Sequence, residues 1–340
     1  MIGGSMSEAQ TLANRTHMNW GPIALTAIGA IMAGLAVNSA MQPAELPYQR
    51  TIVDAAPETY AALSLPASDP AMSVKKLEWR VSSVREPIAT AVVATDADGR
   101  HVPLDWQNNV TEPVFAADLR MTEVSKVLAA IREHVPENAV VLSWWDLSRK
   151  IRLVAQRQAP LDDPYARGLI LPTAWQSASG LIDEQENTYW GKGVSEADGK
   201  KFTHYIDALL LDEIKGADAL RALVPDGKDV YVAVHLSDIW KAAASRHDQI
   251  GIAYKDIPSG GQSHSVMKAA KDWIREQKIE GGYAVEPVGN AVRLHYFTGK
   301  DSSNLLLAKL LPFSTSNPMQ LERFELVYQH RGFWVYKLKG

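Results

Sequence analysis

The sequence contains no cysteine, and that absence excludes several classes of protein at once. Disulfide bonds, thiolate metal sites, iron–sulfur clusters, covalently attached c-type haem and a cysteine nucleophile all require this residue. The nine histidines include no His-x-x-x-His or His-Glu-x-x-His pair, so a zinc site has no support in the sequence either. We therefore expect no metal and no cofactor on this chain, although the lack of disulfides does not identify the compartment.

An excess of basic residues and the common catalytic motifs are also lacking. The 340 residues hold 35 Lys and Arg against 39 Asp and Glu, a net charge of −4, which argues against a nucleic-acid-binding protein. There is no Gly-x-Ser-x-Gly elbow, no Walker phosphate loop and no Gly-x-Gly-x-x-Gly fingerprint. With 46% hydrophobic and 22% charged residues the chain has the composition of a folded protein, but the sequence predicts no catalytic residue.

Charge is absent from one N-terminal stretch, which has no Asp, Glu, Lys or Arg between Arg15 and Glu45. Residues 20–41 within it are apolar or small enough to cross the hydrocarbon core as a helix. We predict a transmembrane anchor at 20–41 after a cytoplasmic N-terminus at 1–19, with a cleaved signal peptide as the alternative. The flanking arginines balance, so the positive-inside rule sets no orientation. A single span before a large domain is usually a signal-anchor, so we expect a single-pass protein of the bacterial inner membrane with a periplasmic C-terminal domain.

The chain after the predicted anchor divides by composition. Residues 42–72 are rich in Pro, Ala and Ser, which is typical of a linker. Residues 73–119 contain β-branched runs on both sides of the turn-forming segment 96–100, which predicts a small β element with a hairpin. The remainder, 120–340, is expected to be the globular domain.

Apolar strands alternate with helical patterns in residues 120–340. A helix is predicted near 122–135, and buried strands are predicted at 139–145 and 229–234. Two hairpins are expected near the C-terminus, at 283–297 and 324–338. This alternation predicts an α/β fold with a mixed or parallel sheet, flanking helices and C-terminal β-hairpins.

One motif stands out in the predicted strand at 139–145, which ends in Trp144-Trp145-Asp146. The carboxyl ends of such strands are where α/β proteins place ligand sites. Two aromatic walls beside a carboxylate could bind a hydroxyl or an amide, and His235 follows the strand at 229–234 and is expected at the same edge. We therefore predict a ligand- or partner-binding corner at Trp144, Trp145, Asp146 and His235. The alternative is structural, with Asp146 capping the next helix and both rings in the core.

A second stretch combines acidic and aromatic side chains. Asp183, Glu184 and Glu186 precede Tyr189 and Trp190. Two interpretations stay open, a solvated face or a docking edge for a basic partner.

The motif resembles the Trp-Trp-Asp motif of oligosaccharyltransferase catalytic subunits, which opens their soluble C-terminal domain. The strand at 229–234 and the hairpin at 324–338 are similar to elements of that domain, so the resemblance covers about 120–340. It implies that Trp144, Trp145 and Asp146 form a recognition corner for a peptide hydroxyl. The family's Tyr-Gly continuation is replaced by Leu147-Ser148, and the multi-span membrane domain that holds the family's metal and lipid donor has no counterpart. Catalysis is therefore not expected to carry over.

One anchor followed by this domain also resembles the small membrane protein encoded beside hydroxylamine oxidoreductase in ammonia- and methane-oxidising bacteria. That resemblance implies an accessory role in hydroxylamine oxidation, with a multihaem oxidoreductase as the protein partner and any haem on that partner. Two hypotheses follow. The chain is either a membrane-tethered, non-enzymatic accessory protein, or a glycosyltransferase-related peptide- or glycan-binding domain that needs a separate catalytic subunit.

Overall fold

The computed structural model of the chain describes residues 45–54, 73–161, 169–191, 195–258, 263–288 and 290–340. The chain divides into two units, Met1–Glu45 and Leu46–Gly340, and every element below lies in the second. The N-terminal segment at 1–19 and the predicted anchor at 20–41 lie outside the described residues. Within the described ranges, no helix has both the length and the apolar character needed to cross a bilayer.

The first sheet is antiparallel, in the order β1-β2-β3-β4, and three of its strands lie in the stretch 73–119 where the sequence predicts a small β element. Its strands are β1 (Gln49–Asp54), β2 (Ser73–Arg80), β3 (Ala89–Thr95) and β4 (His101–Asn108). The turn between β3 and β4 has Gly99 at a φ of 77°, which glycine adopts without strain. Strand β1 lies inside the stretch 42–72 that composition marks as a linker. Its β-branched Thr51, Ile52 and Val53 favour an extended strand, which pairs with β2 along its whole length.

The central sheet is mixed, as predicted, with the order β10-β11-β6-β5. Strands β5 (Val140–Ser143) and β6 (Val230–His235) are parallel and fully buried, as expected of apolar runs covered on both faces. Strand β11 (Phe333–Leu338) pairs antiparallel with β6 and forms the predicted C-terminal hairpin with β10 (Phe324–His330).

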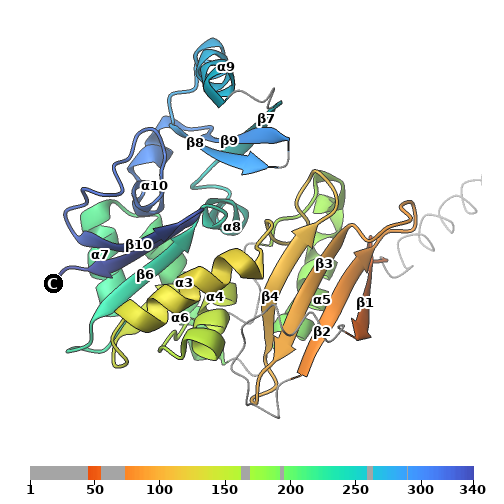
Figure 1. The fold of residues 1–340 in the computed structure, drawn as a ribbon, viewed down its shortest axis with the longest axis horizontal. Coiled ribbons are helices and arrows are strands. Elements are labelled where there is room, and N and C mark those ends of the chain that lie inside the picture. The colour runs from red at the N-terminus through yellow and green to blue at the C-terminus, as the bar shows by residue number, and fades with distance from the viewer. Residues whose placement is uncertain (1–44, 55–72, 162–168, 192–194, 259–262, 289) are drawn as a thin grey trace, which may run out of the picture. The chain divides into compact units, whose positions relative to one another are not determined.

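Helices cover the two faces of the central sheet (Figure 1). Alternate residues of β5 face different cores, because Val141 joins the cluster around α3 (Met121–His134) and Leu142 joins the cluster around α6 (Glu196–Leu209). Helices α7 (Glu213–Ala222) and α10 (Leu306–Leu310) pack beside α6. A capping box at Ser195 and Asp198 begins α6.

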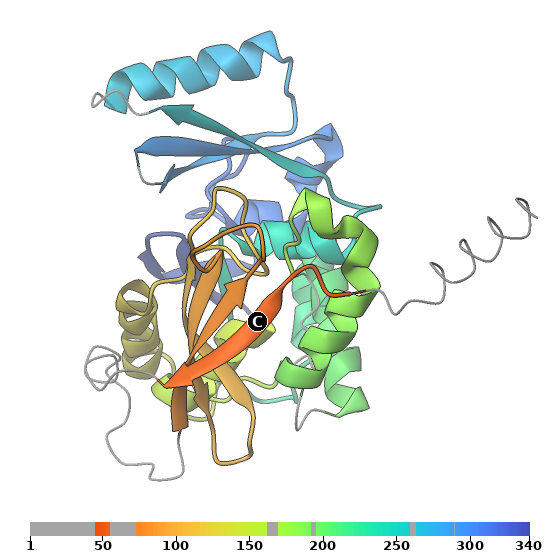
Figure 2. The same cartoon turned by 90° about the vertical axis from the view of Figure 1, so that its right-hand side faces the viewer.

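The other predicted hairpin, at 283–297, forms but belongs to a separate sheet of order β7-β9-β8. Strands β7 (Ile252–Pro258), β8 (Tyr283–Val288) and β9 (Ala291–Phe297) are antiparallel. Helix α9 (Ser263–Glu276) lies along one face of this sheet (Figure 2) and contacts it through Trp273 against Tyr296. The opposite face carries Tyr254, Arg293 and His295.

Two of the remaining helices follow β5 and β6, and a third packs on the first sheet. Helix α4 (Trp145–Lys150) follows β5 and continues as a π-helical turn, η1 (Ile151–Ala155). Helix α8 (Asp238–Ser245) follows β6. Helix α5 (Ser179–Trp190) packs on the first sheet and follows the 3₁₀ turn η2 (Thr173–Ala178). A further 3₁₀ turn, η3 (Lys300–Asn304), precedes α10. The described part of the chain thus confirms a mixed α/β fold, with three sheets and eight α-helices.

Candidate functional site

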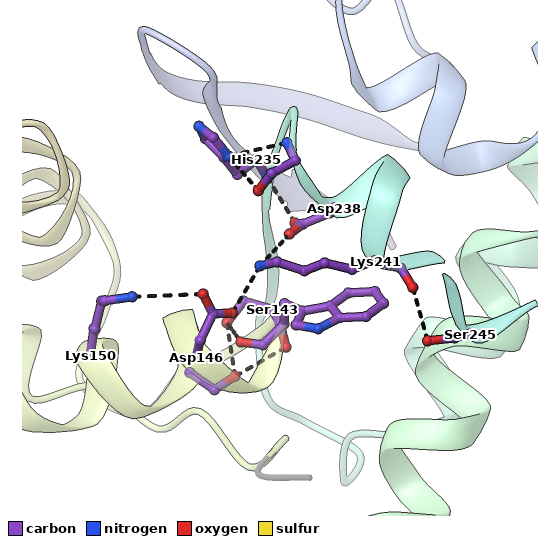
Figure 3. A network of polar contacts seen from close by, with 10 residues as sticks. Ser143, Asp146, Lys150, His235, Asp238, Lys241 and Ser245 are labelled. Atoms are coloured by element: carbon purple, nitrogen blue, oxygen red, sulfur yellow. Dashed lines mark hydrogen bonds and ion pairs between the residues drawn. The ribbon is translucent and has the colours of Figure 1, made fainter. Parts of the chain in front are cut away.

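The predicted corner lies at the carboxyl edge of the two parallel strands (Figure 3). Ser143 at the end of β5 pairs in register with Ala233 of β6. Trp144, Trp145 and Asp146 therefore leave the sheet close to His235. The two places that the sequence singled out are separate in the chain and meet at one edge of the fold.

Asp146 is the centre of a buried ion network. Its Oδ1 lies 3.0 Å from Nζ of Lys241, and its Oδ2 lies 3.7 Å from Nζ of Lys150. Lys241 also donates to Oδ1 of Asp238, at 3.1 Å. The other oxygen of Asp238 accepts the backbone N–H of His235 at 2.9 Å. One continuous set of polar contacts thus joins α4, α8 and the end of β6.

Burial and charge act against each other in this network. Burial raises the pKa of Asp146, but the ammonium groups of Lys241 and Lys150 outweigh it and lower that pKa to about 2. Burial lowers the pKa of Lys150 to about 8, against the attraction of Asp146. Burial also raises the pKa of Asp238, while the two carboxylates overcome burial and raise the pKa of Lys241. The carboxylate of Asp146 therefore carries its charge at neutral pH because two cations face it.

The helix-cap interpretation of Asp146 is wrong. Helix α4 begins at Trp145 with Trp144 at the N-cap position, and no side chain caps it. Asp146 lies in the first turn, where a negative charge is favourable, but its side chain is committed to lysines from two helices.

Both tryptophans of the motif are buried among other aromatic rings. Trp144 is 0% exposed and packs edge-on against Phe202 of α6, with ring centroids 5.1 Å apart. Trp145 is 6% exposed and packs against Trp190 of α5, at 5.7 Å. A cavity of about 40 Å³ lies beside them, lined also by Asp146 and Lys150. This volume holds a few water molecules, and it is too small for a sugar or a peptide.

His235 is held by its own turn. The backbone N–H of Ser237 donates to Nδ1 of His235 at 3.2 Å, and the hydroxyl of Ser237 lies 2.8 Å from the same nitrogen. The ring packs on Phe333 of β11, and burial lowers its pKa to about 4. Among the described contacts no hydrogen bond joins His235 to Asp146 directly. The two residues are connected through Asp238 and Lys241, so this edge does not hold an acid–base pair.

A larger cleft, of about 1060 Å³, borders the corner. Ser237 and Leu169 line both the small cavity and the cleft. On the cleft side, the indole N–H of Trp240 donates to Nδ1 of His295 at 3.0 Å, and Nε2 of His295 lies 3.0 Å from Oε2 of Glu286. These three residues lie outside the motifs that stand out in the sequence.

For His295, the sequence signal is the alternation of polar residues along β9. Arg293 and His295 are buried polar residues two apart in a strand, on the same face, and buried polar groups need partners. Across all the residues that the structure describes, no group of three or more His, Asp or Glu side chains could hold a metal ion.

A family model described as HaoA-associated protein HaoB matches residues 15–338. No curated protein matches the sequence. Among solved structures, the C-terminal domain of PglB from C. jejuni is similar, with 12% identity, a TM-score of 0.37, and coverage of 64% of this chain and 99% of that one. The C-terminal globular domain of the oligosaccharyltransferase from Archaeoglobus fulgidus is also similar, with 13% identity, a TM-score of 0.31, and coverage of 63% and 96%.

The family model confirms the resemblance to the protein associated with hydroxylamine oxidoreductase. Both of these solved structures are C-terminal domains of the kind that the Trp-Trp-Asp motif resembles. At these identities and TM-scores, neither domain bears on the function of the chain.

Proposed function

The chain belongs to the HaoB family of HaoA-associated proteins, whose model matches residues 15–338, and on this premise we propose that it is an accessory protein that binds HaoA in hydroxylamine oxidation. The observation that carries the proposal is the extent of that match, which includes the predicted anchor as well as the globular domain. In this proposal the partner is a multihaem oxidoreductase, and the present chain does no redox chemistry itself. The absence of cysteine supports this division, because covalently attached c-type haem needs cysteine.

The proposal includes a membrane tether. The charge-free stretch between Arg15 and Glu45 supports a single span at 20–41, with the domain on the periplasmic side of the bacterial inner membrane. Such an anchor would confine the domain to the membrane surface and raise its effective concentration near a partner held there.

Trp144, Trp145, Asp146 and His235 have a supporting role in the proposal. Their side chains are buried, so a partner would contact the residues that cover them and not these side chains directly. The ion network around Asp146 fixes α8 against α4 through Lys241. Because α8 also contributes Trp240 to the wall of the large cleft, the network would hold that wall in a fixed position.

Co-purification from native membranes tests the association. The full chain, tagged at its C-terminus, would be mildly crosslinked in cells, extracted in detergent and analysed by mass spectrometry. We expect HaoA to be recovered in near-stoichiometric amount, and to be lost when an unrelated single-pass protein carries the same tag. Recovery of HaoA at the level of that control would overturn the proposal.

A further inference from the structure

The large cleft is formed by segments that are far apart in the sequence. One wall is the face of β7, β8 and β9 that carries Tyr254, Arg293 and His295, and another is the side of α8 that carries Trp240. Further surface comes from residues 112, 113 and 117, from residues 169–171, from η2 and from the side of α5 that carries Asp183. At about 1060 Å³ the cleft is large enough for several side chains of a bound segment.

Three carboxylates line this cleft, from three separate segments of the chain. Glu112 lies after β4, Asp183 in α5 and Glu286 in β8. Glu112 accepts two hydrogen bonds from Thr173, and Glu286 accepts one from His295, but both donors are neutral unless His295 is protonated. Within the described ranges, none of the three has a Lys or Arg partner within 4.0 Å. Partial burial raises the pKa of Asp183, as expected of a carboxylate without a cation beside it.

The two arginines of the cleft each pair first with a carboxylate other than these three, although Arg293, like His295, helps to lower the pKa of Glu286. Arg293 forms a bidentate pair with Asp256, with both N–O distances at 2.8 Å. Arg246 donates through Nε and Nη2 to Oδ1 of Asp207, at 3.0 and 2.8 Å. Each guanidinium is balanced by its own carboxylate, so Glu112, Asp183 and Glu286 add negative charge in excess of the positive charge. The open face of the cleft is therefore acidic.

Aromatic surface lies beside the carboxylates. The ring of Trp240 packs edge-on against Tyr254, with centroids 5.8 Å apart, and is fixed by its hydrogen bond to His295. Lysine and arginine side chains need both kinds of surface, since their alkyl stems pack on apolar walls and their charged ends bind carboxylates or aromatic faces.

We propose that this cleft binds a lysine- or arginine-bearing segment of a partner protein, held by Asp183, Glu286 and Glu112 and by the ring of Trp240. The identity of the partner as HaoA rests on the proposed function, whereas the charge preference of the cleft rests on its own residues. The acidic, aromatic stretch at 183–190 thereby contributes one carboxylate to a docking surface through Asp183, while Glu186 of the same stretch is fully buried and pairs with Arg50.

The test uses the purified full chain in detergent and two fluorescent peptides of equal length, one alternating Lys with Ser and the other alternating Glu with Ser. Fluorescence anisotropy measures both affinities. We expect the lysine peptide to bind at least tenfold more tightly, and added salt to weaken it. Asp183→Asn combined with Glu286→Gln should weaken it at least tenfold. Glu184→Gln removes one negative charge from the neighbouring position of α5, outside the cleft, and should change the affinity less than twofold.

Two results would overturn the proposal. One is equal binding of the two peptides, and the other is an equal loss in the Glu184→Gln control and the cleft double variant. Circular dichroism of each variant shows that it is folded. Co-purification of HaoA is scored separately, so a cleft that prefers the lysine peptide while HaoA fails to co-purify would refute the proposed function and leave the cleft assignment supported.

Discussion

The carboxylate of Asp146 is the residue on which the buried network depends. It faces two ammonium groups, Lys241 at 3.0 Å and Lys150 at 3.7 Å, and both lysines are buried. A buried charge that loses its partner pays its desolvation cost without compensation. The aspartate of the Trp-Trp-Asp motif therefore stabilises the fold, because it pairs with two buried lysines.

We predict that Asp146→Ala lowers the free energy of unfolding by about 3–5 kcal/mol, because it leaves Lys150 with only the weaker attraction of Asp105 and Lys241 with only Asp238. Urea unfolding of the full chain in detergent measures the change. The matched control is Asp229→Ala, which breaks the exposed pair with Lys337 and should cost about 1 kcal/mol or less. A loss for Asp146→Ala as small as the control's would show that the network adds no stability.

His235 predicts a pH dependence of stability. Its pKa is lowered by burial from 6.5 to about 4, so between these values the unfolded chain binds a proton that the folded chain does not. The free energy of unfolding should then fall as the pH drops from 6.5 towards 4, by up to roughly 3 kcal/mol for this group.

The check is the midpoint of urea unfolding at several pH values between 7.5 and 4.5. His235→Gln should flatten the decline over this range, whereas His330→Gln, at the end of the edge strand β10, should keep it. Identical pH profiles for the wild type and the His235 variant would contradict the assignment.

The position of these residues could be predicted from the sequence, but their partners could not. An apolar strand followed by Trp-Trp-Asp places Asp146 at the carboxyl edge of a sheet, and the same argument places His235 there. Lys241 lies 95 residues from Asp146, in a helix whose pattern gives no sign that one lysine points inward. For the same reason the link between Trp240 and His295 depends on two elements that meet only in the folded chain.

At the level of elements, strand β1 is fastened to helix α5 by one buried carboxylate. Glu186 is fully buried and accepts from Arg50 at 2.8 Å and from the indole of Trp190 at 2.8 Å. It also accepts the hydroxyl of Tyr48, just before β1. Figure 2 shows the start of β1 next to α5. This contact fixes the edge strand that follows the predicted anchor.

We predict that Glu186→Gln releases β1, because the amide cannot balance the charge of Arg50 in a buried setting. Hydrogen exchange of the β1 backbone amides should accelerate at least tenfold, while exchange in β5 and β6 stays unchanged. Glu184→Gln, an exposed change in the same helix, is the control. Unchanged exchange in β1 would show that pairing with β2 alone holds the strand.

The predicted elements that were confirmed are those with a strong local pattern. The buried strands β5 and β6, helix α3 and both hairpins follow from apolar runs, helical spacing and turn residues. Strand β1 was missed because prolines on both sides give its stretch the composition of a linker. The separate sheet of β7, β8 and β9 was missed because strand pairing across a helix such as α9 is decided by packing and leaves no local signal.

At the level of the whole globular unit, buried charge and the open cleft have complementary roles. The network around Asp146 satisfies its charges internally, so it offers little to a ligand. The cleft beside it keeps carboxylates that no lysine or arginine of the described residues pairs with. We infer that the Trp-Trp-Asp motif stabilises the fold and that the partner binds the neighbouring cleft.

The affinity of purified HaoA for the purified full chain, held in a lipid nanodisc, decides whether the two proteins associate through the cleft. Biolayer interferometry at two salt concentrations reports it. We expect saturable binding that weakens with salt and falls at least tenfold in the Asp183→Asn, Glu286→Gln double variant, but not in Glu184→Gln. The absence of saturable binding between the two wild-type proteins would show that the chain does not bind HaoA.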